Sequence, residues 1–168
     1  MYIETERLFI TEFDLSMAES VHLNSLDEDN RKFVPDEVFE TVEEAKETLE
    51  YLIEQYNGEG GPYVYPILLK NGKNIGYVQA VLIDEGWEIG YHIGKEFTKQ
   101  GYATETVKAF LPVIMKKINI DAIFGICLAD NVASRIVLER TGFIKLFEGV
   151  GNYQGKKRKI CRYIYRMA

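Results

Sequence analysis

One stretch, residues 86–117, constrains the fold more than any other part of the chain. Within residues 87–93, apolar and aromatic side chains alternate with polar or small ones, which predicts a β-strand. After a short polar loop, apolar residues recur at helical spacing as far as Lys117. A strand, a loop whose helix breaker is Gly101 and a long helix are therefore expected to follow one another directly.

The beginning of this helix is suited to bind a phosphate. The first N–H groups of a helix have no intrahelical partner, and the helix dipole adds about half a positive charge there. Gly101 has no Cβ, so a bulky anion can approach the main chain, while Ala103 is small and Thr104 offers a hydroxyl. The competing interpretation is an ordinary amphipathic helix with a glycine in its N-terminal turn.

Strand, glycine-bearing loop and helix in this order resemble the acetyl-CoA site of the GNAT acetyltransferase superfamily. The family's loop motif is Gln/Arg-x-x-Gly-x-Gly/Ala, and Gly101 and Ala103 match its last two defined positions. Thr98 stands where the family usually has Gln or Arg. The resemblance implies that acetyl-CoA is held by the main chain of the strand and by the loop, at Tyr91, His92, Ile93, Thr98, Lys99, Gln100, Gly101, Tyr102, Ala103 and Thr104.

Three further blocks support the resemblance over nearly the whole chain. Residues 131–143 are similar to the family's Asn-led helix that ends at Gly-Phe, in the N-x-x-S form of acetyltransferases that modify the N-termini of ribosomal proteins. Residues 3–8 resemble the opening strand of that branch, and residues 102–105 its loop exit. Asn131 and Ser134 are implied cofactor contacts in this comparison, although Asn131 is also suited to cap its helix.

The resemblance also implies the chemistry, which is direct attack of an amine on the thioester of acetyl-CoA. Glu88 is the candidate base, and burial must raise its pKa for that role; a solvent-facing Glu is the alternative. His92 has the same side-chain parity and is a weaker rival. Ser134 is the candidate acid toward the departing thiolate, or a helix residue that only touches the cofactor. Leu138 stands where many members have a tyrosine acid.

Composition and charge exclude several other classes. A length of 168 residues fits a single domain, residues 1–168, and a net charge of −6 disfavours nucleic-acid binding and favours amine substrates. The basic run 155–159 is the exception, and a solvated hairpin turn is its simpler explanation. No leader and no apolar run of ~20 residues is apparent, so a cytoplasmic protein without a membrane role is expected. The histidines and cysteines form no metal-binding pattern.

The remaining periodicity predicts one α/β domain with a mixed, mostly antiparallel sheet flanked by helices. Hydrophobic alternation and turn signals give the strands, and capping and helical spacing give the helices. Pro112 is expected to bend the long helix. An irregular apolar cluster, residues 33–39, is expected near the acceptor site. The predicted strands are 8–12, 63–69, 75–83, 87–93, 122–128 (covered on both faces), 143–148 and 160–167, and the predicted helices are 13–26, 41–56, 102–117 and 131–140.

Taken together, the sequence predicts an N-acetyltransferase that transfers an acetyl group from acetyl-CoA to a primary amine. The acceptor is left open among a protein N-terminus, a polyamine, an amino acid and an amino-bearing antibiotic. Tyr63 and Tyr65 are either core residues or an acceptor wall with Phe33 or Phe39. An acyl-CoA-binding sensor without turnover and a nucleic-acid-binding module are the alternatives, and a homodimer is possible.

Overall fold

The computed structural model describes residues 1–33 and 35–167. Val34 lies outside the described residues and the side chains of Phe33 and Pro35 are not described, so most of the predicted apolar cluster cannot be compared. The strands are β1 (Ile3–Glu4), β2 (Leu8–Ile10), β3 (Tyr63–Leu69), β4 (Asn74–Ile83), β5 (Gly86–Ile93), β6 (Ala122–Leu128), β7 (Ile144–Tyr153) and β8 (Lys156–Arg166). The helices are α1 (Ala18–Ser25), α2 (Glu28–Phe33), α3 (Val42–Gln55), α4 (Tyr102–Ile118) and α5 (Val132–Arg140), with 3₁₀ turns η1 (Leu15–Met17), η2 (Pro35–Glu37) and η3 (Lys95–Phe97).

The strands form one open sheet in the order β1-β2-β3-β4-β5-β6-β8-β7. Neighbouring strands are antiparallel, with the exception of β5 and β6, which run parallel. Short turns join β3 to β4, β4 to β5 and β7 to β8, and Gly72, with φ +89°, lies between β3 and β4, as the Asn71-Gly72 pair predicts. The α/β class and the mostly antiparallel mixed sheet are confirmed.

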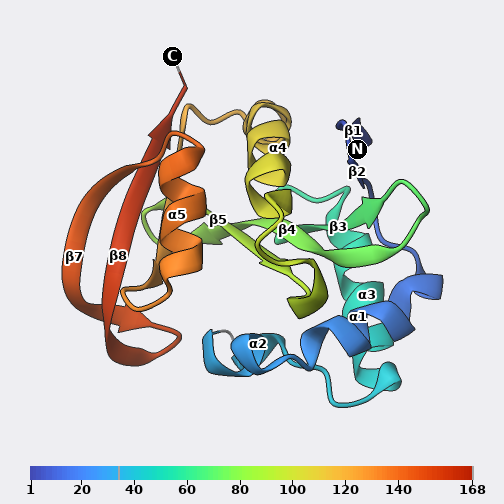
Figure 1. Cartoon of the computed structure of the whole chain (residues 1–168). Helices are drawn as coiled ribbons and strands as arrows, with labels where there is room; N and C mark the ends of the chain where they lie inside the picture. The colour runs from blue at the N-terminus through green and yellow to red at the C-terminus, as the bar shows by residue number, and fades with distance from the viewer. Residues whose placement is uncertain (34, 168) are drawn as a thin grey trace.

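Helices cover both faces of the sheet (Figure 1). Strand residues alternate between the faces, so Tyr63, Tyr65 and Ile67 of β3 belong to the larger core beneath α4, which contributes Val107 and Phe110. On the opposite face, Val64 packs with Leu49 and Leu52 of α3 and Ala18 of α1. Tyr63 and Tyr65 are therefore core residues, with 2% and 0% exposure, and neither lines the main cavity.

Local signals account for most helix ends. Thr41 accepts a hydrogen bond from the Glu44 N–H at 3.1 Å, while Glu44 reaches back to the N–H of Glu40 at 2.9 Å. In the predicted capping box the Glu44 carboxylate would accept from the N–H of Thr41, but here it accepts from the N–H of Glu40, one residue earlier. Helix α4 runs continuously past Pro112, and the bend expected there stays a prediction.

Two expectations about strands are wrong. In β6, Ile123, Gly125 and Cys127 are buried, but Phe124 and Ile126 on the other face are partly exposed, so the strand is not fully covered on both faces. The terminal hairpin is also longer than expected, because β7 continues to Tyr153 and β8 begins at Lys156. Only Gln154 and Gly155 form the turn, and the basic residues 156–159 are exposed on β8.

Candidate active site

The two strands at the centre of the sheet separate soon after they meet. The parallel pairing of β5 with β6 covers only Glu88 with Phe124 and Ile89 with Gly125. Beyond Ile89, β5 keeps its partner on the β4 side but has no ladder partner on the β6 side among the described residues. A cavity of about 1520 Å³ extends through this gap, between the start of α4 and α5. A hydrogen-bonding strand edge is thus available to a ligand in the cavity.

The N-terminus of α4 opens into the same cavity. Gly101 adopts the left-handed conformation with φ +82°, and the first N–H with an intrahelical partner is that of Glu105, which donates to the Gly101 carbonyl at 3.0 Å. In the described part of the chain no side chain caps this helix. Gly101, Tyr102, Ala103 and Thr104 line the cavity. These residues fit a pyrophosphate, since main-chain donors and the helix dipole point to one place.

Side chains from the connection between β1 and β2 hold this loop in place. Arg7 lies between β1 and β2, and its Nε donates to Glu105 Oε1 at 2.7 Å, while its Nη1 donates to the Gln100 carbonyl at 2.9 Å. The Arg7 guanidinium also lies 4.3 Å from the centroid of the Tyr102 ring. Thr5 Oγ1 completes the cluster by donating to Glu105 Oε2 at 2.6 Å. The loop is therefore anchored on the side that faces away from the cavity.

Most residues predicted from the sequence line this one cavity. They come from β5, from the loop and first turn of α4, and from α5: Glu88, Tyr91, His92, Ile93, Thr98, Lys99, Gly101, Tyr102, Ala103, Thr104, Asn131 and Ser134. Gln100 is the exception, because its carbonyl binds Arg7 and its side-chain amide donates to the Glu96 carbonyl at 3.3 Å. Thr98 uses its hydroxyl to donate to the Lys95 carbonyl at 2.9 Å.

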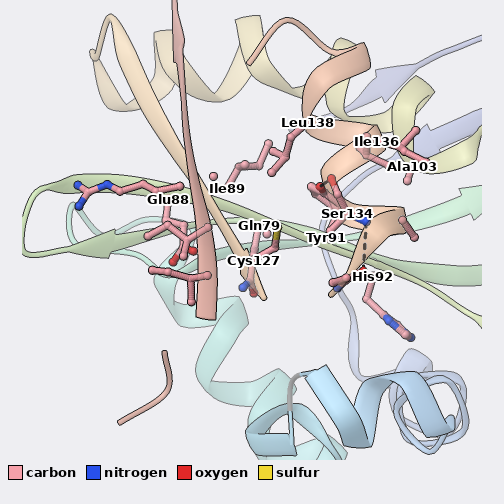
Figure 2. Close-up of a pocket in the computed structure, with 18 of the residues that line it drawn as sticks. Gln79, Glu88, Ile89, Tyr91, His92, Ala103, Cys127, Ser134, Ile136 and Leu138 are labelled. Atoms are coloured by element: carbon pink, nitrogen blue, oxygen red, sulfur yellow. Dashed lines mark hydrogen bonds between the residues drawn. The ribbon is translucent and has the colours of Figure 1, made fainter. Parts of the chain in front are cut away.

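Glu88 lies at the end of the cavity away from Ala103 (Figure 2). Burial, with a smaller contribution from the charge of Glu37, raises the pKa of Glu88 to about 7, although Arg162 opposes the shift. A carboxylate with this pKa is half protonated near neutral pH and can exchange a proton with an amine. The electrostatic requirement for the predicted base is met.

His92 is engaged by another group. Its Nε2 lies 3.1 Å from Asp27 Oδ2, and both side chains are largely buried. The His92 ring also lies beside Tyr77, at 5.9 Å between centroids. The helical arm below the sheet consists of α1, α2 and η2. Asp27 immediately precedes α2, so this pair connects the end of β5 to the helical arm. Because His92 is paired with Asp27, a role in anchoring the helical arm is a simpler interpretation of this side chain than a role as the base.

Ser134 and Asn131 lie at the start of α5. Asn131 caps the helix, because its side chain accepts a hydrogen bond from the Ser134 N–H at 3.2 Å. The Tyr91 hydroxyl crosses the gap between the strands and donates to the Ser134 carbonyl at 3.0 Å. Ser134 is held through its main chain, and its side chain belongs to the cavity lining (Figure 2). The cap is therefore real, and a contact of Asn131 with pantetheine stays a prediction.

Leu138 fills space and offers no proton. It is 2% exposed, and a Cβ built on Gly125 would lie 2.6 Å from Leu138 Cδ2. Gly125 thus allows α5 to approach β6 closely. This contact explains why an apolar residue is accommodated at the position where the resembling family often has a tyrosine.

The sequence did not single out several residues of the cavity. Glu37 and Arg162 line the cavity close enough to Glu88 for their charges to act on it, Gln79 contacts Glu37, and Cys127 of β6 also belongs to the lining. Glu37 belongs to η2, in the region with the faintest periodicity, and Gln79 faces Gly90 across the β4–β5 pair. The sequence signal that could have identified Gln79 and Arg162 is a polar side chain within an otherwise apolar strand, β4 or β8.

Metal-binding groups and membrane-spanning helices are both absent from the described residues. Among residues 1–33 and 35–167, no group of three or more His, Cys, Asp or Glu side chains is placed to hold a metal ion. Across the same ranges, no helix combines the length and apolarity that a bilayer crossing needs. The cytoplasmic location and the homodimer stay predictions.

Comparison with known proteins identifies similar sequences and folds. A family model described as "Acetyltransferase (GNAT) domain" matches residues 7–144, which is most of the chain. The uncharacterized N-acetyltransferase YnaD of Bacillus subtilis (strain 168) is 28% identical over 161 residues, which is 90% of this chain and 91% of that protein.

Solved structures have the same fold at low sequence identity. The ribosomal L7/L12 alpha-N-protein acetyltransferase RimL, in complex with coenzyme A, has a TM-score of 0.84 and 20% identity, covering 99% of this chain and 98% of that one. The ribosomal-protein-S5-alanine acetyltransferase from Vibrio fischeri has a TM-score of 0.84 and 19% identity, covering 99% and 96%. The fold that contains this cavity is thus also the fold of proteins named as acetyltransferases.

Proposed function

The chain belongs to the GNAT acetyltransferase family, and we propose that it transfers the acetyl group of acetyl-CoA to a primary amine. Acetyl-CoA enters between β5 and β6, with its pyrophosphate on the N–H groups of Tyr102, Ala103 and Thr104. Its acyl end lies along the β5 edge beyond Ile89, where main-chain groups have no β6 partner in the described chain. The bound coenzyme A of the similar RimL structure supports this assignment.

The reaction needs one proton acceptor and stabilised charge at the thioester. Glu88 takes a proton from the acceptor ammonium, directly or through water, and the freed nitrogen forms a bond to the carbonyl carbon. Successive N–H groups of a strand point to opposite sides, so those of Tyr91, His92 and Ile93 that do not face β4 offer donors to the carbonyl oxygen. The carbon–sulfur bond then breaks, the second proton of the attacking nitrogen passes to the leaving sulfur, and the Ser134 hydroxyl donates a hydrogen bond to that sulfur. The products are an amide and coenzyme A.

One observation carries the proposal: a carboxylate with a pKa of about 7 shares a cavity with an uncapped helix N-terminus. A passive acyl-CoA sensor needs the helix N-terminus but gains nothing from a buried carboxylate, because burial of a charge is unfavourable. The Glu88 environment therefore favours the enzyme over the sensor.

The test combines binding and turnover. Calorimetry with coenzyme A measures the first step, and release of free thiol from acetyl-CoA in the presence of a panel of primary amines measures the second. Wild type should bind coenzyme A and release thiol only when an amine is present, while Glu88→Gln should keep the binding and lose at least about 100-fold in turnover. Binding without amine-dependent thiol release would leave the sensor as the better description.

A further inference from the structure

We propose that the acceptor amine carries a second cationic group, and that Glu37 holds this group while Glu88 takes the proton from the reacting nitrogen. This inference rests on the proposed function and names its substrate class. It starts from Glu37, a residue that the sequence patterns did not select, whose carboxylate lines the same cavity as Glu88.

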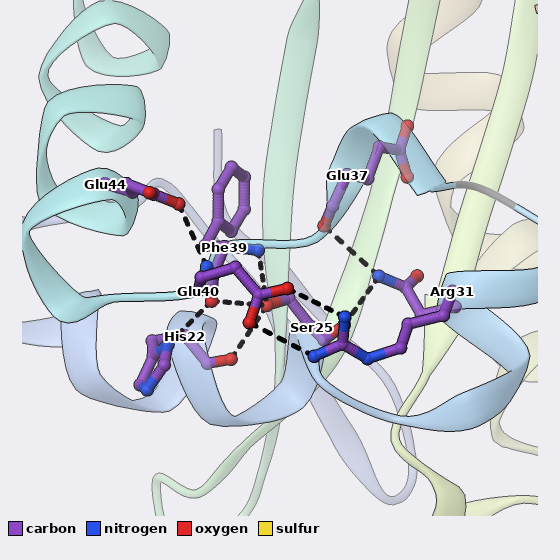
Figure 3. Close-up of polar contacts among 8 residues, drawn as sticks. His22, Ser25, Arg31, Glu37, Phe39, Glu40 and Glu44 are labelled. Atoms are coloured by element: carbon purple, nitrogen blue, oxygen red, sulfur yellow. Dashed lines mark hydrogen bonds and ion pairs between the residues drawn. The ribbon is translucent and has the colours of Figure 1, made fainter.

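The main chain of Glu37 is fixed by the helical arm beneath the sheet. The Asn30 side-chain amide donates to the Glu37 carbonyl at 3.2 Å and to the Ser25 carbonyl at 2.9 Å. Next to it, Arg31 donates to both carboxylate oxygens of Glu40, at 2.7 and 3.2 Å. Figure 3 shows the Glu37 carboxylate directed away from these contacts. The arm thus presents this side chain in a set position.

The Glu37 carboxylate is incompletely satisfied by the protein. Its Oε1 accepts a long hydrogen bond from Gln79 Nε2, at 3.4 Å. Its Oε2 is buried and has no hydrogen-bond partner among residues 1–33 and 35–167. Burial raises the pKa of Glu37, as expected for a carboxylate that lacks a cation. A buried acceptor of this kind is costly unless a ligand supplies the missing donor.

The cations near this end of the cavity lie against other groups, although Arg162 Nε is buried without a hydrogen-bond partner among the described residues. Arg162 lies 3.7 Å from Glu85 and over the Phe124 ring, with 4.5 Å to the ring centroid. His92 is paired with Asp27. In the described part of the chain, no ion pair within 4 Å includes Glu37 or Glu88, although the charge of Glu37 raises the pKa of Glu88. Two neighbouring carboxylates therefore face one cavity, and the nearest cation, Arg162, forms no ion pair within 4 Å with either of them in the described chain.

The number of positive charges that the acceptor must carry indicates its chemical class. The reacting ammonium loses its positive charge when its proton moves to Glu88, so it cannot also compensate Glu37 through the reaction. A second ammonium group on the same acceptor can do so. An acceptor with a carboxylate close to its amine would meet Glu37, and the acidic rim formed by Asp84 and Glu85, with like charge. A diamine fits these constraints better than a free amino acid.

Three acceptors of matched length test the proposal: 1,4-diaminobutane, butylamine and 4-aminobutanoate. Thiol release should give the highest kcat/KM for the diamine and the lowest for 4-aminobutanoate. Glu37→Gln keeps the side-chain shape, and it should lower kcat/KM for the diamine about tenfold or more while changing that for butylamine less than about threefold. Glu54→Gln is the matched control, because it removes the same charge from an exposed position on α3 and should change neither value.

Calorimetric titration of 1,4-diaminobutane into the protein with bound coenzyme A gives a readout that is independent of turnover. Wild type should bind the diamine at least about tenfold more tightly than Glu37→Gln, and Glu37→Lys should shift the preference toward 4-aminobutanoate. Equal diamine affinity in wild type and Glu37→Gln, absence of diamine binding, or a wild-type preference for butylamine would overturn the proposal. These outcomes would leave coenzyme A binding and amine-dependent thiol release unaffected. Only the loss of those two activities would contradict the proposed function itself.

Discussion

Arg7 and Glu105 are 98 residues apart in the chain, yet the Arg7 guanidinium lies 2.7 Å from the Glu105 carboxylate. The Arg7 N–H donates to the same carboxylate at 3.1 Å, and its guanidinium also binds the Gln100 carbonyl. Glu105 lies in the first turn of α4, where a carboxylate is favoured by the helix dipole. The pair therefore fixes the helix whose N-terminus faces the cavity.

Arg7→Ala should weaken coenzyme A binding without abolishing it, because the loop loses its external anchor but keeps its main-chain donors. An increase in Kd of roughly tenfold is expected, which corresponds to about 1.4 kcal/mol. Calorimetry measures it. Arg31→Ala breaks a similar Arg–Glu pair outside the cavity and should leave the affinity unchanged. Equal losses in both variants would contradict a specific role for Arg7.

Gly101→Ala should reduce both stability and coenzyme A affinity. A non-glycine residue at φ +82° costs about 1–2 kcal/mol, and the new methyl group would lie 3.4 Å from the Arg7 guanidinium that anchors the loop, so the N–H groups at the start of α4 would be displaced. Gly72→Ala is the matched control, since Gly72 has φ +89° and open space around it, far from the cavity in the β3–β4 turn. Both variants should unfold at lower denaturant concentration, but only Gly101→Ala should bind coenzyme A more weakly. Unchanged affinity in Gly101→Ala would argue against phosphate binding here.

The pH dependence of kcat/KM should report the ionisation of Glu88. Because the basic form is the unprotonated carboxylate and its pKa is about 7, the rate should rise with pH through that value and then level off. In Glu88→Gln the limb near pH 7 should disappear and the rate should fall about 100-fold or more. Persistence of that limb in the variant would assign it to another group.

The same side chain should make stability depend on pH. The pKa of Glu88 is raised in the folded state, so its contribution to stability is fully present below about 4.5, the ordinary value, and is lost as pH rises through about 7. Glu88→Gln should therefore increase the free energy of unfolding by about 1–3 kcal/mol at pH 8 and by little at pH 4. Denaturant titrations of both proteins at these two pH values measure the difference. Equal effects at both would show that charge burial is not the cause.

The elements proposed to bind acetyl-CoA could be predicted because short-range patterns determine them. Alternation gives β5, the glycine gives the break before α4, and helical spacing gives α4 itself, so Gly101 and Ala103 are located by local signals. The family resemblance adds Glu88 and Ser134, and the structure brings both to one cavity.

The acceptor side was not predictable in the same way. Glu37 lies in a single 3₁₀ turn whose position depends on side-chain contacts from Asn30 and from the distant Gln79. Arg7 is similar, since nothing in residues 3–8 indicates a partner at position 105. The extended β7–β8 hairpin was missed because glycines at 149 and 151 suggested a turn, whereas they lie within β7 next to the side chains of Phe147 and Ile160.

Two residue pairs join β5 to β6 in the middle of the sheet, whereas eight join β4 to β5. A molecule lodged in the gap would bridge both strands and substitute for the missing ladder, so its binding energy adds to the resistance of the whole chain against unfolding. We expect the protein to resist digestion by an added protease for longer when coenzyme A is present, and to be cleaved faster as the coenzyme A concentration is lowered.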